Sequence, residues 1–267
     1  MLGHSGPDQR ELRLRRWSPG RGCRRGDAVV NEPLAAIPFR PDLADDLAVA
    51  ALALARRFAA GAALWCVAPS GEPHAQHIAV EFVHPAAAGV QARPAAALTG
   101  PYLVDTARVS ARPGDMVLAV AAAHEPQVRS LLLRSPAWGV HTIWIGSGPR
   151  PAAGLADHLL WLDGPESRLP AAGELVLLYH LLWELTQRCF AHPDLVAPEH
   201  GPEHREVRRE EGRLGEVVTP LGDGTARIRT PLGTETVMTT FVEPVRPGDL
   251  VLVHAGMAVS TAGLEDE

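Results

Sequence analysis

A histidine and a glutamate four residues apart give the chain its clearest candidate for chemistry. His77 and Glu81 lie in residues 74–83, which we expect to be helical. Residues at i and i+4 share one helix face, so the imidazole and the carboxylate can converge on one metal ion or substrate. The same spacing suits a solvated pair, or a buried hydrogen-bonded pair left from an ancestral site. The spacing therefore predicts either a ligand-binding pair or a structural one.

Two further histidines stand in apolar surroundings. His180 lies in a long apolar segment, residues 171–189, that we expect to form a helix. Buried histidines in such segments are more often hydrogen-bonded core residues than ligands. His254 ends an apolar predicted strand, residues 250–253, and could equally bond within its own domain or contact a partner.

Composition narrows the classes of protein. The chain has 267 residues and a net charge of −6, and all 25 of its basic side chains other than histidine are arginine. A negative balance argues against a general nucleic-acid binder, and no apolar stretch is long enough to span a membrane. Cys23, Cys66 and Cys189 are too few and too scattered for a disulfide scaffold or a four-ligand zinc site. We expect a reducing, cytoplasmic location.

Short apolar runs alternate with helical segments in the first part of the chain. Such alternation predicts a parallel sheet covered by helices on both faces, an α/β three-layer domain. We place this domain at residues 41–192, after an N-terminal arm at residues 1–40. The predicted strands are 63–67, 95–98, 115–120, 142–145 and 158–162, and the predicted helices are 42–60, 74–83, 126–134 and 171–189.

The character of the sequence changes near its last quarter. Residues 193–212 are rich in Pro, Glu, His and Arg, which is linker composition. Short alternating strands with Gly-containing turns follow in residues 213–267 and predict a small all-β barrel. Its predicted strands are 215–218, 225–229, 234–238, 241–242 and 250–253.

The first domain resembles the SIS (sugar isomerase) domain, in its phosphoheptose-isomerase-like branch. The motif Ala75-Gln-His77-Ile-Ala-Val-Glu81-Phe-Val83 is similar to a helix of that branch. The strand at Pro113-Gly-Asp115 resembles one of its strands, and the late helix carrying His180 resembles its C-terminal helix. The resemblance implies a divalent metal, zinc, held by His77, Glu81 and His180 beside the reacting sugar, with Glu81 and His180 as catalytic candidates. It also implies a homo-oligomer formed through this domain.

The sequence departs from that family where ligands are held. The family's late glutamine is replaced by Ala172. Its phosphate-binding loops correspond to Val67–Gly71 and Ala121–Glu125, where a proline and three alanines remove donors and Glu125 adds a negative charge. Ser70 remains as a possible oxyanion-binding residue. We therefore expect a degenerate domain and favour a non-enzymatic role for it.

The second domain resembles the HypC/HupF family of hydrogenase assembly chaperones. Leu214-Gly-Glu-Val217 and the run from Arg246-Pro-Gly-Asp249 through His254-Ala-Gly256 carry the resemblance. It implies an OB-like barrel that docks to a HypD-like protein or to the hydrogenase large-subunit precursor, through Asp249, His254 and Gly256. The family's iron-binding thiol has no counterpart after Cys189. Cys23 could supply it from the arm, but a docking module that carries no iron fits better.

These expectations leave three functions open. The favoured hypothesis is an accessory protein of nickel-iron hydrogenase maturation that acts by docking. The alternatives are a metal-dependent sugar-phosphate isomerase and a sugar-phosphate-binding regulator. No nucleic-acid or membrane partner is expected.

Overall fold

The computed structural model describes residues 41–85, 89–162, 172–197, 212–242 and 244–262. The predicted arm at residues 1–40, with Cys23, lies outside the described residues. So do residues 198–211 of the predicted linker.

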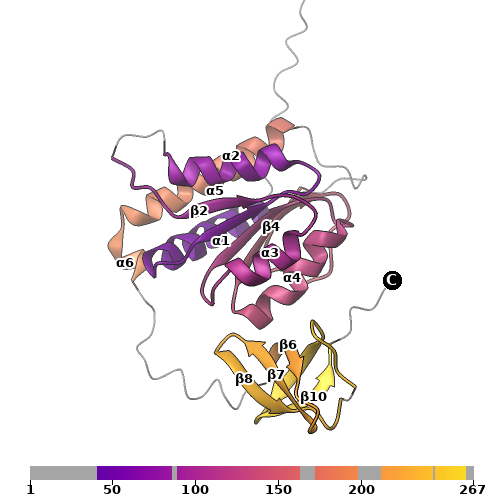
Figure 1. Ribbon diagram of the computed structural model, residues 1–267. Coiled ribbons are helices and arrows are strands. Elements are labelled where there is room, and N and C mark those ends of the chain that lie inside the picture. Colours follow the sequence, from indigo (N-terminus) through magenta and orange to yellow (C-terminus); the bar gives the residue numbers. More distant parts are fainter. Residues whose placement is uncertain (1–40, 86–88, 163–171, 198–211, 243, 263–267) are drawn as a thin grey trace, which may run out of the picture. The chain divides into compact units, whose positions relative to one another are not determined.

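A five-stranded sheet forms the centre of the first domain, with strand order β2-β1-β3-β4-β5 (Figure 1). Every neighbouring pair is parallel, as the apolar strand runs predicted. The order of the strands reverses between β1 and β3, which is where open α/β sheets usually bind ligands. The strands are β1 (Leu64–Val67), β2 (Ala95–Leu98), β3 (Met116–Val120), β4 (His141–Ser147) and β5 (His158–Leu162).

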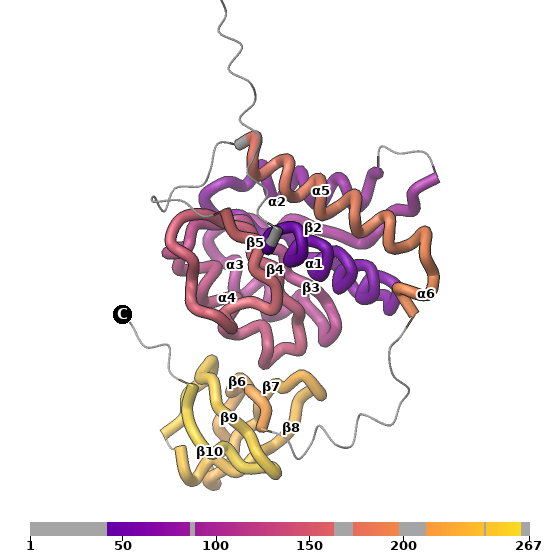
Figure 2. Tube along the Cα trace, turned by 180° about the vertical axis from the view of Figure 1, so that it is seen from behind, coloured from indigo at the N-terminus to yellow at the C-terminus, as the bar shows by residue number. Residues whose placement is uncertain are grey.

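Helices cover both faces of this sheet and complete the predicted three layers. Figures 1 and 2 show α1, α2 and α5 over one face and α3 and α4 over the other. The core is correspondingly double, with one cluster of buried apolar side chains on each side of the strands. The helices are α1 (Pro41–Ala59), α2 (Glu72–Val83), α3 (Leu103–Ser110), α4 (Pro126–Trp138), α5 (Ala172–Phe190) and the short α6 (Pro193–Val196).

Burial explains why the strands were legible in the sequence. All five residues of β3 are buried, so the strand shows a continuous apolar run instead of alternation. Helix α4 extends beyond its predicted end at residue 134 to Trp138, where Gly139 adopts a left-handed conformation (φ 70°) and ends it. Helix α3 was not predicted, because it is short, mixes four apolar with four polar residues, and buries only Leu103 and Ala107.

The second domain is a closed five-stranded barrel with the order β10-β8-β7-β6-β9, which confirms the predicted all-β barrel. A strand was predicted at residues 241–242, and this was wrong. Phe241 is exposed and Val242 closes a turn by donating its N–H to the carbonyl of Thr239, so neither residue joins the sheet. The strands are β6 (Arg213–Pro220), β7 (Thr225–Thr230), β8 (Gly233–Met238), β9 (Leu250–His254) and β10 (Met257–Thr261).

Within the described part of the chain, no helix combines the length and apolar character needed to cross a membrane.

Candidate metal and ligand site

Helix α2 positions the first two residues of the site. It begins after Gly71, with Pro73 in the first turn, where a missing N–H costs nothing. Its apolar face packs on β1 and β2. His77 and Glu81 lie beside that face, and their side chains are 40% and 25% exposed. The buried residues of the helix are Ala75, Ile78, Ala79 and Phe82.

Helix α5 supplies the third residue. Its buried side chains Leu175, Leu178 and Leu182 fix the helix against the core, which leaves His180 40% exposed and directed toward α2. The indole N–H of Trp183 donates to the carbonyl oxygen of Glu81 at 2.9 Å and ties the two helices together.

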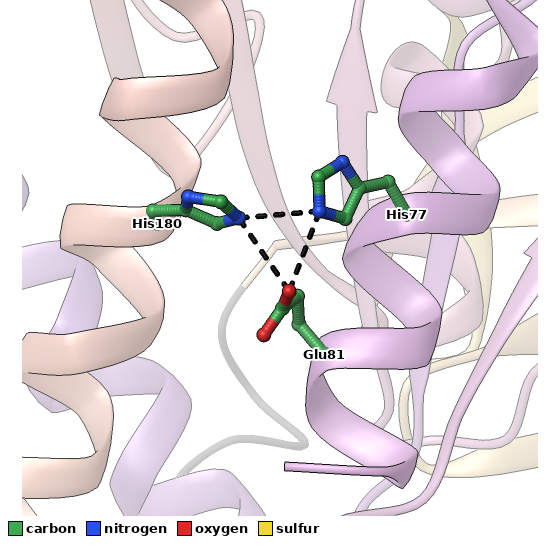
Figure 3. Close-up of side chains that lie close together, drawn as sticks. All are labelled: His77, Glu81 and His180. Atoms are coloured by element: carbon green, nitrogen blue, oxygen red, sulfur yellow. Dashed lines mark hydrogen bonds and ion pairs between the residues drawn. The ribbon is translucent and has the colours of Figure 1, made fainter. Parts of the chain in front are cut away.

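His77, Glu81 and His180 meet in the space between the two helices (Figure 3). Nε2 of His77 lies 3.3 Å from Oε1 of Glu81 and 3.2 Å from Nε2 of His180. Nε2 of His180 lies 3.5 Å from the same carboxylate oxygen. One ligand atom from each residue thus lies within 4.8 Å of the others, and among the described residues no other group of His, Cys, Asp and Glu does so.

This donor set fits a zinc ion. Two imidazole nitrogens and one carboxylate oxygen are the ligands of several zinc enzymes, whose fourth position is kept for water or substrate. Imidazole and carboxylate groups also suit other divalent transition metals. The sequence-predicted metal ligands His77, Glu81 and His180 are therefore brought together by the fold.

A second layer of hydrogen bonds lies behind His77. The hydroxyl of Tyr179 is 3.0 Å from Nδ1 of His77 and 3.5 Å from Nδ1 of His74. Burial, and then the charge of Glu81, raises the pKa of Tyr179 to about 12, so the phenol keeps its proton at neutral pH. Burial and the neighbouring His77 lower the pKa of His74.

Neither Tyr179 nor His74 was singled out from the sequence. His74 precedes His77 by three residues and so shares its helix face, a spacing that could have found it. Tyr179 adjoins His180 in a segment of apolar residues, where an aromatic residue is most simply explained as core. Its side chain is indeed buried, and only the structure shows what its hydroxyl touches.

A cleft of about 360 Å³ lies where β1, β2 and β3 end. It contains Ser70, the predicted ligand-binding residue, and Glu125 from the loop before α4. The hydroxyl of Ser70 donates to Oε2 of Glu125 at 2.8 Å, so its proton is already directed to a carboxylate. This arrangement disfavours an anion beside Ser70.

A polar cluster at the start of β4 and β5 holds two further histidines, His141 and His158. Nη2 of Arg57 is 3.1 Å and Oδ2 of Asp157 is 3.2 Å from Nδ1 of His141, whose ring lies 4.9 Å from that of His158. Burial, followed by the charge of Arg57, lowers the pKa of His141 to about 4. Burial also lowers the pKa of His158.

The predicted docking residues lie at two turns of the barrel. Asp249 accepts the N–H of Arg246 at 2.7 Å and closes the turn before β9. His254 ends β9 with an exposed side chain. Gly256 follows in a left-handed conformation (φ 79°) that favours glycine. Asp249 and Gly256 thus have turn-forming roles, and His254 faces solvent.

A buried carboxylate that the sequence analysis overlooked joins the barrel to the α/β domain. Glu216 of β6 accepts hydrogen bonds from Nε1 of Trp138 at 2.6 Å, Nη1 of Arg134 at 2.8 Å and Nε of Arg108 at 3.1 Å. Its side chain is 3% exposed. A glutamate between apolar residues of a predicted strand was the available signal, since a buried charge needs partners.

No protein-family model matches the chain, and no curated protein matches its sequence. Among solved structures, the phosphoheptose isomerase of Neisseria gonorrhoeae is similar over 56% of this chain and 86% of its own, with 17% identity and a TM-score of 0.44. A phosphoheptose isomerase from Francisella tularensis is similar over 57% and 88%, with 13% identity and a TM-score of 0.47. The protein HobA of Helicobacter pylori is similar over 58% and 82%, with 13% identity and a TM-score of 0.39.

Proposed function

We propose that this chain binds a divalent metal ion, zinc by its donor set, and uses it to hold a sugar or sugar phosphate, as an isomerase or as a binding protein. The convergence of His77, Glu81 and His180 on one point carries the proposal. The SIS-like motif around His77 and the three-layer parallel fold support it.

The residues of the site suggest how the work is divided. A bound metal ion would polarise a carbonyl or hydroxyl oxygen of the ligand. Glu81 is the carboxylate closest to that point. It can also accept or hold a proton, and an aldose–ketose isomerisation requires such a proton transfer. A groove of about 250 Å³ opens along Glu81, His180 and Trp183 and gives a ligand access from solvent.

A phosphate group of the ligand would meet both favourable and unfavourable charges in the cleft at the strand ends. The cleft at the strand ends is bordered by the first turns of α2 and α4, whose N–H groups favour anions. Glu72 and Glu125 in the same lining oppose them. Any binding test therefore needs the matching free sugar as a control for each sugar phosphate.

The direct test is metal binding by the purified protein. We expect about one zinc ion per chain in the wild type and severe loss of affinity in His77→Ala and Glu81→Gln, each of which removes one of three ligands. His84→Ala is the matched control, because His84 is exposed at the end of the same helix. Wild-type protein that binds no divalent metal would refute the proposal.

The sugar arm is tested separately. A panel of aldose phosphates and the matching free sugars is added to the zinc-loaded wild type and to Glu81→Gln, and the unfolding temperature and isomer ratio are measured. A shift for the wild type alone supports binding at the metal site, and conversion of aldose to ketose supports an enzyme. No response to any sugar would limit the chain to metal binding.

A second candidate function rests on the barrel. We propose that it docks to a HypD-like protein or to the large-subunit precursor of a nickel-iron hydrogenase, as an accessory factor in maturation. The closed barrel of residues 213–261 and the exposed His254 after β9 are compatible with such docking. Affinity capture from the native host under hydrogenase-inducing conditions, compared with His254→Ala, tests it. Recovery of neither partner counts against it.

A further inference from the structure

The tyrosine behind His77 holds that histidine from the side opposite Glu81 and His180. Tyr179 belongs to α5, and His77 belongs to α2, so the 3.0 Å contact between the hydroxyl and Nδ1 crosses the helix interface. Nε2 of the same imidazole is the atom directed to Glu81 and His180. The ring of His77 is thus fixed by contacts at both of its nitrogens.

A metal ligand of this kind has a defined proton position. An imidazole that gives its Nε2 lone pair to a metal carries its proton on Nδ1, and that N–H needs an acceptor. The phenol oxygen of Tyr179 lies where such an acceptor is required. A hydroxyl both donates and accepts, so it can accept from His77 and direct its own proton to another group.

His74 is that other group. Its Nδ1 lies 3.5 Å from the hydroxyl of Tyr179, at the long limit of a hydrogen bond. The space for its ring depends on Gly71, because a Cβ there would come within 3.0 Å of Cδ2 of His74. His74 thus acts on His77 only through Tyr179, and its contribution to metal affinity is expected to be smaller than that of Tyr179.

The aromatic ring of Tyr179 is itself firmly placed. It is 2% exposed, and it packs edge-to-face against His74, His77 and His180 with ring centroids 5.9, 5.4 and 5.3 Å away. Removal of the hydroxyl alone leaves all of these ring contacts in place. The hydrogen bond can thus be deleted without altering the packing.

We propose that Tyr179 is a positioning residue for the metal site, which accepts the Nδ1–H of His77, directs Nε2 toward Glu81 and His180, and is supported by His74. This inference rests on the metal site of the proposed function. Hydrogen-bond partners of ligating histidines contribute about 10- to 100-fold to metal affinity.

The test measures zinc affinity by competition with a chromogenic chelator. Tyr179→Phe is expected to weaken zinc binding about 10-fold or more. The other tyrosine of the chain, Tyr102, is 73% exposed, and Tyr102→Phe is the matched control that should leave affinity unchanged. His74→Ala is expected to weaken binding less, and to add little in the Tyr179→Phe background, because both changes act through one hydrogen-bonded row.

A second readout separates positioning from a general structural effect. In the zinc-loaded wild type, the Nδ1–H of His77 should give a downfield proton resonance that exchanges slowly with water, and Tyr179→Phe should remove that protection while the unfolding temperature of the metal-free protein stays within a few degrees. Equal zinc affinity in wild type and Tyr179→Phe would overturn the inference alone. Absence of zinc binding in the wild type would overturn the proposed function, and the inference with it.

Discussion

Two glutamates of this molecule stand among nitrogen donors, and they differ in what balances their charge. Glu216 is 3% exposed and contacts two arginines and a tryptophan. Glu81 is 25% exposed and contacts two histidines. Guanidinium groups are cationic at every accessible pH, whereas imidazoles are cationic only when protonated.

The difference separates a carboxylate with a structural role from one that we propose to be functional. Glu216 is fully balanced by the chain itself, so nothing further is needed there. The balance around Glu81 depends on a proton or on an added cation, which is the property expected of a site that exchanges ligands. The two carboxylates have similar nitrogen neighbours, and they are distinguished by the type of partner and by burial.

The largest effect is expected from removal of the buried carboxylate. Glu216→Ala removes the carboxylate partner of the largely buried Arg134 and leaves Arg108 paired with the exposed Asp105, and it should lower the free energy of unfolding by about 3–5 kcal/mol. Denaturation by urea measures it. Glu81→Gln is the contrasting variant, and its metal-free stability should lie within about 1 kcal/mol of wild type. If the two variants are equally destabilised, the comparison fails.

Zinc should narrow the difference in stability between the variants of the two carboxylates. At a free zinc concentration of about 100 times the dissociation constant, binding to the folded state adds about 2.7 kcal/mol to stability. We expect this gain in the wild type and in Glu216→Ala, and none in Glu81→Gln. Calorimetry with and without zinc provides the measurement, and a gain that survives in Glu81→Gln would show that the metal binds elsewhere.

His141 lies beside the guanidinium group of Arg57, so it tests how a fixed cation affects a neighbouring histidine. The pKa of His141 is lowered to about 4 by burial and by Arg57, below the unfolded value of 6.5. The folded state thus excludes a proton that the unfolded state takes up, so this stability is fully present above pH 6.5 and is lost as the pH falls toward 4.

His141→Gln should therefore flatten the fall in stability between about pH 6.5 and 4, an effect that we expect to be about 1–2 kcal/mol after allowance for solvent screening. Unfolding curves at a series of pH values measure the slope. His124→Gln, at a loop position outside this cluster, should leave the slope as it is in the wild type. An unchanged slope in His141→Gln would assign the acid sensitivity to other groups, beginning with His158.

The smallest effect is expected at a carboxylate that is paired but exposed. Glu184 accepts from Nη2 of Arg188 at 2.8 Å on the surface of α5, and the two side chains are 52% and 72% exposed. Glu184→Gln should change stability by no more than about 0.5 kcal/mol. A much larger change would mean that pairing, and not burial, sets the cost at Glu216.

Local patterns predicted those parts of the fold that depend on local sequence. Strands β1 to β5 could be recognised in the sequence as apolar runs, and His77 and Glu81 were paired by helical spacing. The short helix α3 and the strand β10 were not identified, and Phe241-Val242 was taken for a strand although both residues form a turn. Short segments with mixed composition carry too weak a periodicity to separate a helix, a strand and a turn.

Contacts between residues that are far apart in the chain could not be predicted from the sequence. His180 lies 103 positions from His77, and a family resemblance, not spacing, brought the two together. The contact of Tyr179 with His77 and the pairing of Glu216 with Arg134 depend on how separate elements pack, which no window of sequence contains.

The tie between Glu216 and helix α4 also fixes an order of events during synthesis. Arg134 leaves the ribosome 82 residues before Glu216, so the α/β part of the chain can assemble while the barrel is still unmade. Until strand β6 arrives, the guanidinium of Arg134 and the indole N–H of Trp138 have water in place of the carboxylate. The nascent first domain therefore carries Arg134 and Trp138 without their carboxylate partner until strand β6 is made.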